Sequence, residues 1–268
     1  MSDAPAVRRA GPGTTTGGAR PRPTRAWLPS QHGAWAMLAV PLLVGVAAGG
    51  FSPWQVVLAA AAVSGYLASA TAQAWARSRR RGPLAPPLTY GAVFVALGLA
   101  LVATHPALLA ALVVLVPATI VVAAGARPGT RRDLANTLAQ VAQATVLVPA
   151  AASLGPSADP ATIAEATAIA AAYLLGTVLV VRSVLRERGN VAFAAFSAGY
   201  HLALLAMAVV ALPWPYAALA LGLTGRAVAL PLLQGRWAGT DHPLRPVHVG
   251  MVELAAGVAL VVVAFATL

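Results

Sequence analysis

The segment PSQHGAWAMLAVP, residues 29–41, marks the point at which a charged N-terminal stretch gives way to the first long apolar run of the chain. Runs of the same kind follow one another to the C-terminus. Only 9% of the residues are charged, whereas a soluble domain carries about 25%. This composition predicts an all-α, polytopic transmembrane helical bundle and argues against a large soluble core.

The composition also separates two regions. Residues 1–26 are rich in Pro, Gly, Thr and Arg and are expected to form a disordered, basic, cytoplasmic tail, whereas residues 27–268 are expected to form one transmembrane helical domain. Nine apolar segments of this domain are long enough to cross or nearly cross a bilayer, which takes about 20 residues. They lie near 33–50, 54–75, 88–104, 107–126, 134–154, 161–183, 191–212, 214–235 and 247–267. In the first of them, Gly45 and Gly49 have the spacing of closely packed membrane helices.

The arginine distribution supports a count of about nine helices. The 18 basic residues are all arginines, and apart from Arg226 they lie in the tail or in and beside every second loop. The alternate loops, GGFSP, THPA, GPSADP and LPWP, contain none. The positive-inside rule then places the N-terminus in the cytoplasm and the C-terminus outside the cell membrane.

Some kinds of chemistry are excluded by composition. The chain has no cysteine, so it cannot form a disulfide, a thiol nucleophile or a cysteine-based metal site. The five histidines show no metal-ligand spacing, so neither a metal nor a cofactor is expected. The net charge of +11 does not indicate nucleic-acid binding, because membrane orientation accounts for arginines in short loops.

Polar side chains inside the apolar segments are the candidates for function, because an ionisable group at a helix centre costs about 2.5–3.5 kcal/mol on insertion scales. Nearly all of them fall in the predicted cytoplasmic half. Asn136, Gln140 and Gln143 share one stripe of a helix, at i, i+4 and i+7. We therefore expect a polar chamber open to the cytoplasm, with a ligand bound by His32, Gln73, Arg77, Asn136, Gln140, Arg182, Arg186, Arg226 and Glu253.

Each candidate also has a purely structural interpretation. His32 can be an interface residue, the Asn136 stripe can hold helices together by hydrogen bonds, and the arginines near loops can be ordinary inside charges. Arg226 and Glu253 are ionisable groups at comparable depth, so we expect them to pair or to share one aqueous pocket, with or without catalysis. His201, about ten residues into its segment, is expected to be a satisfied buried histidine.

The opening segment resembles the signature of the YwiC-like family of bacterial membrane proteins, Pro-x-[Gln/Glu]-His-Gly-Ala-Trp followed by a Met and by a Pro inside the helix. The matching residues are Pro29, Gln31, His32, Gly33, Ala34, Trp35, Met37 and Pro41. The stretches VLVVRSVLRERGN (178–190) and RPVHVGMVELAAG (245–257) also resemble that family. The resemblance implies an integral membrane protein and no particular reaction.

A second resemblance, to the UbiA-type prenyltransferases, concerns architecture. That superfamily also has nine helices around a cytoplasmic chamber, and its functional loops follow helices 2 and 6, where this chain has AWARSRRRGPLAPP and VRSVLRERGN. UbiA-type enzymes carry aspartate clusters in both places to hold magnesium on a prenyl diphosphate, and this chain has no aspartate in either. The resemblance implies a UbiA-like arrangement without magnesium-assisted prenyl transfer.

Two classes of function remain open. The first is a protein that binds, and as an enzyme would modify, an anionic amphiphile such as an isoprenoid or lipid-like molecule. Its head group would pair with the arginines, its tail would lie in the bundle, and His32 would be the general base or a hydrogen-bond donor. The second is a transporter or a non-catalytic membrane assembly component. A transporter is expected to show a midplane site, broken helices and often repeated halves, and we see no convincing repeat.

Overall fold

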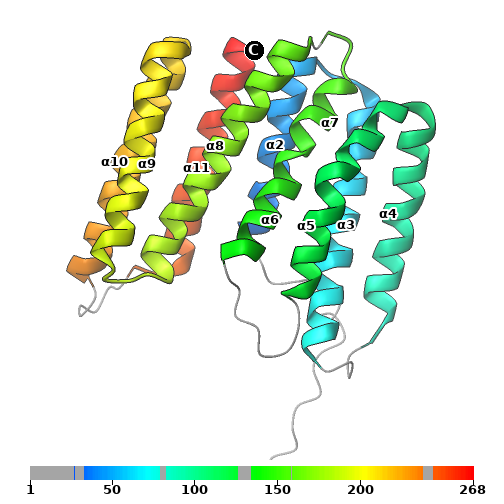
Figure 1. Cartoon of the computed structure of the whole chain (residues 1–268), viewed down its shortest axis with the longest axis horizontal. Helices are drawn as coiled ribbons and strands as arrows, with labels where there is room; N and C mark the ends of the chain where they lie inside the picture. Colours follow the sequence, from blue (N-terminus) through cyan, green and yellow to red (C-terminus); the bar gives the residue numbers. More distant parts are fainter. Residues whose placement is uncertain (1–26, 28–32, 79–82, 126–133, 158, 238–243) are drawn as a thin grey trace, which may run out of the picture.

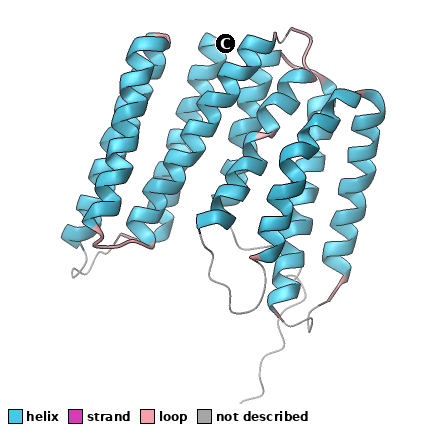
Figure 2. Ribbon diagram, viewed as in Figure 1, coloured by secondary structure: helices cyan, strands magenta, loops and turns pink. Residues whose placement is uncertain are grey.

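The computed structural model describes residues 27, 33–78, 83–125, 134–157, 159–237 and 244–268. Within these ranges the chain is helical with short connections and has no strand (Figure 2), which confirms the all-α prediction. The helices are α2 (Gly33–Gly49), α3 (Pro53–Arg77), α4 (Ala85–Thr104), the 3-10 helix η1 (Pro106–Ala111), α5 (Leu112–Ala124), α6 (Leu134–Thr145), α7 (Leu147–Ser153), α8 (Pro160–Leu185), α9 (Val191–Ala211), α10 (Trp214–Trp237) and α11 (Pro246–Thr267).

Each predicted apolar segment corresponds to one helix or to two consecutive helices. The largest difference at a segment end is three residues, at Ala85, where residue 88 was predicted. In the described part of the chain, seven helical stretches are long and apolar enough to span a membrane: α3, α4, η1 with α5, α8, α9, α10 and α11. The protein is therefore a multi-pass membrane protein.

The segment predicted as one helix over 134–154 is interrupted. α6 ends at Thr145 and α7 begins at Leu147, with Val146 in a turn between them. Pro149 explains the interruption, because it has no N–H to donate to the carbonyl of Thr145 and its ring crowds that carbonyl. The hydrogen bonds from Val146 to Ala142 and from Ala150 to Val146 continue the helical spacing, so the predicted segment is one helical stretch with an irregular position that the sequence analysis did not predict.

The central helix of the bundle is α2, which packs against α7, α8 and α11 (Figure 1). Val44 of α2, Leu174 of α8 and Leu260 of α11 belong to the same buried apolar cluster and are almost fully inaccessible. The α3–α4 hairpin flanks this centre on one side, and the α9–α10 hairpin flanks it on the other (Figure 1). The two hairpins are thus separated by the central helices.

The crossing of α2 and α7 depends on glycine. A Cβ on Gly45 would lie 2.5 Å from the carbonyl oxygen of Val148, and a Cβ on Gly49 would collide with the backbone of Ala152. Real Cβ atoms do not approach backbone atoms so closely, so only glycine allows the two backbones to meet. The close packing predicted from the Gly45–Gly49 spacing is confirmed.

Two helix starts at the same end of the bundle are fixed by side-chain caps. Ser52 and Gln55 form a capping box on α3, and Gln55 Nε2 also donates to the carbonyl oxygen of Ala151 at 2.9 Å. Asp159 caps α8, and hydrogen bonds from the Thr162 hydroxyl and from backbone amides hold the pKa of that exposed carboxyl below its ordinary value. These caps anchor the ends of α3 and α8 opposite to the arginines.

The described arginines mark one end of the bundle. Six of the seven lie where α3, α8 and α10 end or where α11 begins: Arg77, Arg182, Arg186, Arg188, Arg236 and Arg245. We call this the arginine-rich end, and we call the end at which α2, α9 and α11 finish the opposite end (Figure 1). The segregation agrees with the predicted alternation of the loops. Which end faces the cytoplasm stays a prediction.

Candidate functional site

A buried ion pair joins α10 to α11 in the middle of the bundle. Nη1 of Arg226 donates to Oε2 of Glu253 at 2.5 Å, and the two side chains are only 6% and 9% exposed. The interaction predicted from their shared depth is confirmed. Charges buried this deeply persist only when they are paired, because each alone would carry a large desolvation cost.

The ion pair is not fully satisfied. Among the described residues, Nε and Nη2 of Arg226 and Oε1 of Glu253 are buried without a hydrogen-bond partner. The hydroxyl of Tyr173, on α8, donates to the backbone carbonyl of Glu253 at 3.2 Å. Buried polar atoms without partners are uncommon in native proteins and are found where a structure stores strain or receives a ligand.

His201 lies on α9 beside this pair. Its Nδ1 is 2.7 Å from the carbonyl oxygen of Ser197, and its own carbonyl accepts a hydrogen bond from Thr224 at 3.1 Å. The residue is 1% exposed and is close enough to Arg226 to interact with its charge. The prediction of a buried histidine is confirmed, and one ring nitrogen is satisfied by the backbone.

A cavity of about 270 Å³ lies between α8, α11 and the α9–α10 hairpin. It runs from Glu165 and Tyr216, near the opposite end, to Tyr173 and His201 in the middle of the bundle. The ten residues between His201 and Ala211 on α9 correspond to roughly 15 Å of depth. Most of its wall is alanine, leucine, isoleucine and methionine. The cavity is therefore a narrow apolar space with polar groups only at its two extremities.

Tyr173 and His201 separate the cavity from the ion pair. Both residues line the cavity, and both also interact with Arg226. Arg226 and Glu253 themselves are not part of the lining. The ion pair thus lies directly behind the inner end of the cavity and is screened from it by an aromatic ring and an imidazole.

On its other side, the ion pair is closed off from the arginine-rich end. The next turns of α8, α10 and α11 form an apolar cluster that includes Val180, Leu230 and Val249, each 7% exposed or less. These apolar side chains therefore lie between the ion pair and the arginine-rich end. The sequence had grouped Arg226 and Glu253 with the terminal arginines because depth along a helix does not show what fills the next turn.

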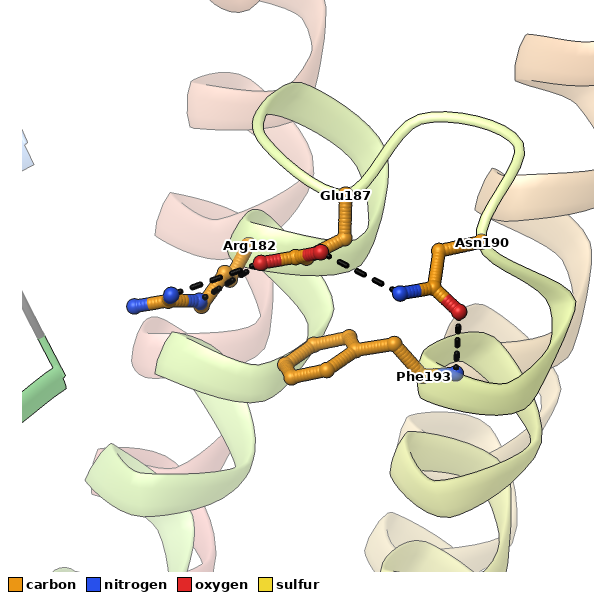
Figure 3. A network of polar contacts seen from close by, with 4 residues as sticks. All are labelled: Arg182, Glu187, Asn190 and Phe193. Carbon is orange, nitrogen blue, oxygen red and sulfur yellow. Dashed lines mark hydrogen bonds and ion pairs between the residues drawn. The ribbon is translucent and has the colours of Figure 1, made fainter.

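Arg182 takes part in a local network at the arginine-rich end (Figure 3). Its Nε and Nη2 donate to Oε1 of Glu187, whose Oε2 accepts from Asn190, and Asn190 in turn caps α9 at the amide of Phe193. The guanidinium carbon of Arg182 lies 5.9 Å from the centre of the Phe193 ring. Nη1 of Arg182 is buried and has no hydrogen-bond partner among the described residues, and the side chain extends away from α9 (Figure 3).

The remaining predicted ligand residues are distributed over separate helices. Gln73 and Arg77 contact each other at the end of α3. The helices α2 and α7 lie between α3 and α8 (Figure 1). Asn136 and Gln140 lie on α6; Asn136 is buried and packs on Gly125. Arg186 follows the last residue of α8. His32 lies outside the described residues.

The polar stripe on α6 forms a contact between helices. Gln143 donates to the hydroxyl of Thr119 on α5 at 2.9 Å. This is the hydrogen-bonding role that the sequence left open for the stripe. Of the predicted ligand residues, the structure brings Arg226 together with Glu253 and Gln73 together with Arg77.

Tyr173 was missed by the sequence interpretation. It is 6% exposed, it lines the cavity and its hydroxyl reaches α11. A tyrosine in the middle of an apolar membrane segment was the available signal, because its hydroxyl needs a partner there. In the described ranges no group of three or more His, Asp or Glu residues could hold a metal ion.

The chain is similar in sequence to one known protein family. A sequence profile described as YwiC-like protein matches residues 28–152, which include α2 to α6 and all but the last residue of α7. The chain is also 31% identical over 181 residues to the uncharacterized protein YwiC of Bacillus subtilis (strain 168), and the match covers 67% of this chain and 76% of that protein. The chain belongs to the YwiC-like family. The profile match ends before α8, so the cavity of this YwiC-like protein lies in the part of the chain that the profile does not cover.

No solved structure matches the chain. The UbiA-like arrangement therefore stays a prediction for this YwiC-like protein.

Proposed function

We propose that this YwiC-like protein binds a lipid-like amphiphile inside the membrane, with the apolar chain of the ligand in the cavity between α8 and the α9–α10 hairpin. The observation that carries the proposal is the cavity itself, with its apolar wall and its polar inner end at Tyr173 and His201. Its size is close to the lower limit of ligand pockets, about 300 Å³. An apolar space within the span excludes water-soluble ligands and suits a molecule that partitions into the bilayer.

Access to the cavity is consistent with a ligand that arrives from the lipid. Ala168 of α8 and Met207 of α9 line the cavity and are exposed on the surface of the bundle. A ligand can therefore enter beside these residues, between α8 and α9, without crossing the arginine-rich end.

The anionic head group predicted from the sequence fits this cavity poorly. The nearest cation, Arg226, is already paired and is screened by Tyr173 and His201, and Glu165 adds a carboxylate near the mouth. For an anionic amphiphile we propose instead a separate contact at Arg182, whose Nη1 has no partner in the described part of the chain.

Mass spectrometry of the lipids that co-purify with the protein tests the proposal. The wild type is expected to retain a specific amphiphile at a near-constant ratio to protein through detergent exchange. Ala168→Trp should lower that ratio several-fold, because the indole fills the cavity. Ala164→Trp is the matched control: Ala164 is also exposed on α8, one turn away, and does not line the cavity. Retention of bulk membrane lipids alone, in equal amounts by all three proteins, would contradict the proposal.

Transport is the second candidate, because Pro149 leaves an irregular position in the middle of the helical stretch formed by α6 and α7. The interruption between Thr145 and Leu147 faces the central helices α2 and α8. If the break serves transport, Pro149→Ala should slow flux of an anionic amphiphile across proteoliposomes, while Pro117→Ala in the exposed helix α5 should leave flux unchanged. Wild-type flux no greater than that of empty liposomes would exclude this candidate.

A further inference from the structure

We infer that the cavity selects a ligand whose uncharged head group carries a hydroxyl, and that this hydroxyl donates a hydrogen bond to Nε2 of His201. The inference rests on the proposed function, since it names the chemistry of the ligand that the cavity receives. It follows from which polar atoms at the inner end of the cavity lack a hydrogen-bond partner among the described residues, and from whether those atoms are donors or acceptors.

The tautomer of His201 is determined by its backbone partner. Nδ1 is 2.7 Å from the carbonyl oxygen of Ser197, and a carbonyl can only accept, so Nδ1 carries the proton. In the neutral ring, Nε2 is then an acceptor. The ring is 1% exposed and has no carboxylate among its hydrogen-bond partners in the described residues, so burial favours the uncharged ring. No hydrogen bond to Nε2 is found among the residues that the structure describes.

The position of Nε2 is set by small residues on α8. A Cβ on Gly176 would lie 2.9 Å from Nε2, so the ring edge that carries this atom faces Gly176. Ala168 and Ala172, at i−8 and i−4 from Gly176, occupy the same face of α8 and line the cavity. Ala172 and His201 both line the cavity, so the cavity ends within one helical turn of the residue that Nε2 faces.

The second polar atom at this end is also an acceptor. The hydroxyl proton of Tyr173 is used in its hydrogen bond to the carbonyl of Glu253, which leaves lone pairs on the phenolic oxygen. Of the lining side chains at this end, His201 offers an acceptor without a partner among the described residues, so it binds a donor, and a carboxylate head group has no proton to donate to it. The nearby guanidinium of Arg226 disfavours a cationic head group. A long-chain alcohol meets these conditions.

Competition binding in lipid nanodiscs tests the inference with farnesol and its methyl ether, which have the same chain and differ in the donor. Displacement of radiolabelled farnesol is measured for wild type and variants in identical nanodiscs, so that differences in membrane partitioning cancel between proteins. We expect farnesol to compete about tenfold better than the ether in the wild type, which is the effect of about one hydrogen bond. His201→Phe should abolish that preference, so that farnesol and the ether compete equally, while the affinity for the ether is retained.

A second variant keeps the test informative if His201→Phe does not fold. Gly176→Ala retains the imidazole and places a methyl group against Nε2, so it should also remove the preference for the alcohol. Gly199→Ala is its control, because a Cβ at Gly199 on α9 meets no atom within 4 Å. The control should keep the wild-type preference.

The outcomes separate the two proposals. Saturable binding of both compounds with equal affinity by the wild type, or a preference that persists in both His201→Phe and Gly176→Ala, overturns the hydroxyl inference and leaves the cavity as a binding site. Absence of saturable binding of either compound overturns both. Loss of binding of both compounds in Ala168→Trp, together with a preference that depends on His201, supports both.

Discussion

Arg226 of α10 and Glu253 of α11 form a buried ion pair in the middle of the bundle, with Nη1 and Oε2 2.5 Å apart. The pair connects the α9–α10 hairpin to the central helices, since α11 packs on α2. It also lies directly behind Tyr173 and His201, which close the inner end of the cavity. The same contact therefore stabilises the bundle and fixes the geometry of the candidate site.

Removal of one partner of the Arg226–Glu253 pair should lower the stability of the protein far more than removal of both. Glu253→Gln leaves the buried guanidinium without a counter-charge and should lower the stability by about 3–5 kcal/mol, measured as thermal unfolding in detergent. Combining Arg226→Leu with Glu253→Leu should restore much of the loss, because no buried charge remains. Glu165→Gln, at an exposed position of α8, is the control. Equal melting temperatures for Glu253→Gln and wild type would show that the pair contributes nothing to stability.

The glycines at the α2–α7 crossing should not tolerate a methyl group. Gly49→Ala and Gly45→Ala place a Cβ into the backbone of α7 and should each destabilise by about 1–3 kcal/mol through overpacking. Gly98→Ala is the matched control in α4, where a Cβ meets nothing within 4 Å. It should be neutral or stabilising by up to about 1 kcal/mol. Chemical denaturation in mixed micelles measures the difference, and similar stability of all three variants would refute the close approach of the helices.

The cap of α9 and the Arg182–Glu187 contact should be energetically coupled, because Asn190 takes part in both. Asn190→Ala removes the acceptor for the Phe193 amide and should cost about 1 kcal/mol, whereas Asn190→Ser retains a cap oxygen and should cost less. Since Asn190 also donates to Glu187, its effect and that of Glu187→Gln should not add. Strict additivity of the two thermal shifts would argue that the residues act independently.

The orientation of the bundle can be tested with single cysteines, because the chain has none of its own. Ser157→Cys, at the opposite end, should react in intact cells with a membrane-impermeant maleimide. Arg236→Cys, at the arginine-rich end, should react only after the membrane is permeabilised, if positive charges remain inside. The reverse labelling pattern would place the arginine-rich end outside and would overturn the predicted topology.

In the described residues, seven of the nine predicted spans are helical stretches long and apolar enough to cross a membrane. The limits of the apolar segments could be predicted well, because the bilayer requires long apolar stretches and the short loops contain prolines, glycines or arginines. The exception was Pro149, where apolar length alone suggested one continuous helix. The ion pair could also be predicted, since Arg226 and Glu253 are charged groups at comparable depth and neither is tolerated alone in an apolar interior. The role of Gly45 and Gly49 followed from their four-residue spacing.

The candidate site was predicted only in part. Tyr173 and His201 lie on different helices, and nothing in their sequence positions indicates that they close one cavity. Likewise, Val180 and Val249 look like ordinary apolar residues, yet they separate Arg226 from the arginine-rich end. In a water-soluble helix, hydrophobic periodicity would have marked the buried face. In a membrane helix the lipid-facing and buried faces are both apolar, so that signal is weak.

The sequence by itself determined the spans, the segregation of arginine and the pairing of the two buried charges, because each follows from the cost of placing a polar group in hydrocarbon. Only the tertiary structure decided which apolar faces meet and where they fail to fill space. Van der Waals packing between helices depends on the shapes of side chains that are distant in sequence. The cavity beside Ala168 and Ala172 arises because two small residues on one face of α8 leave space that the side chains of α9 and α10 do not fill.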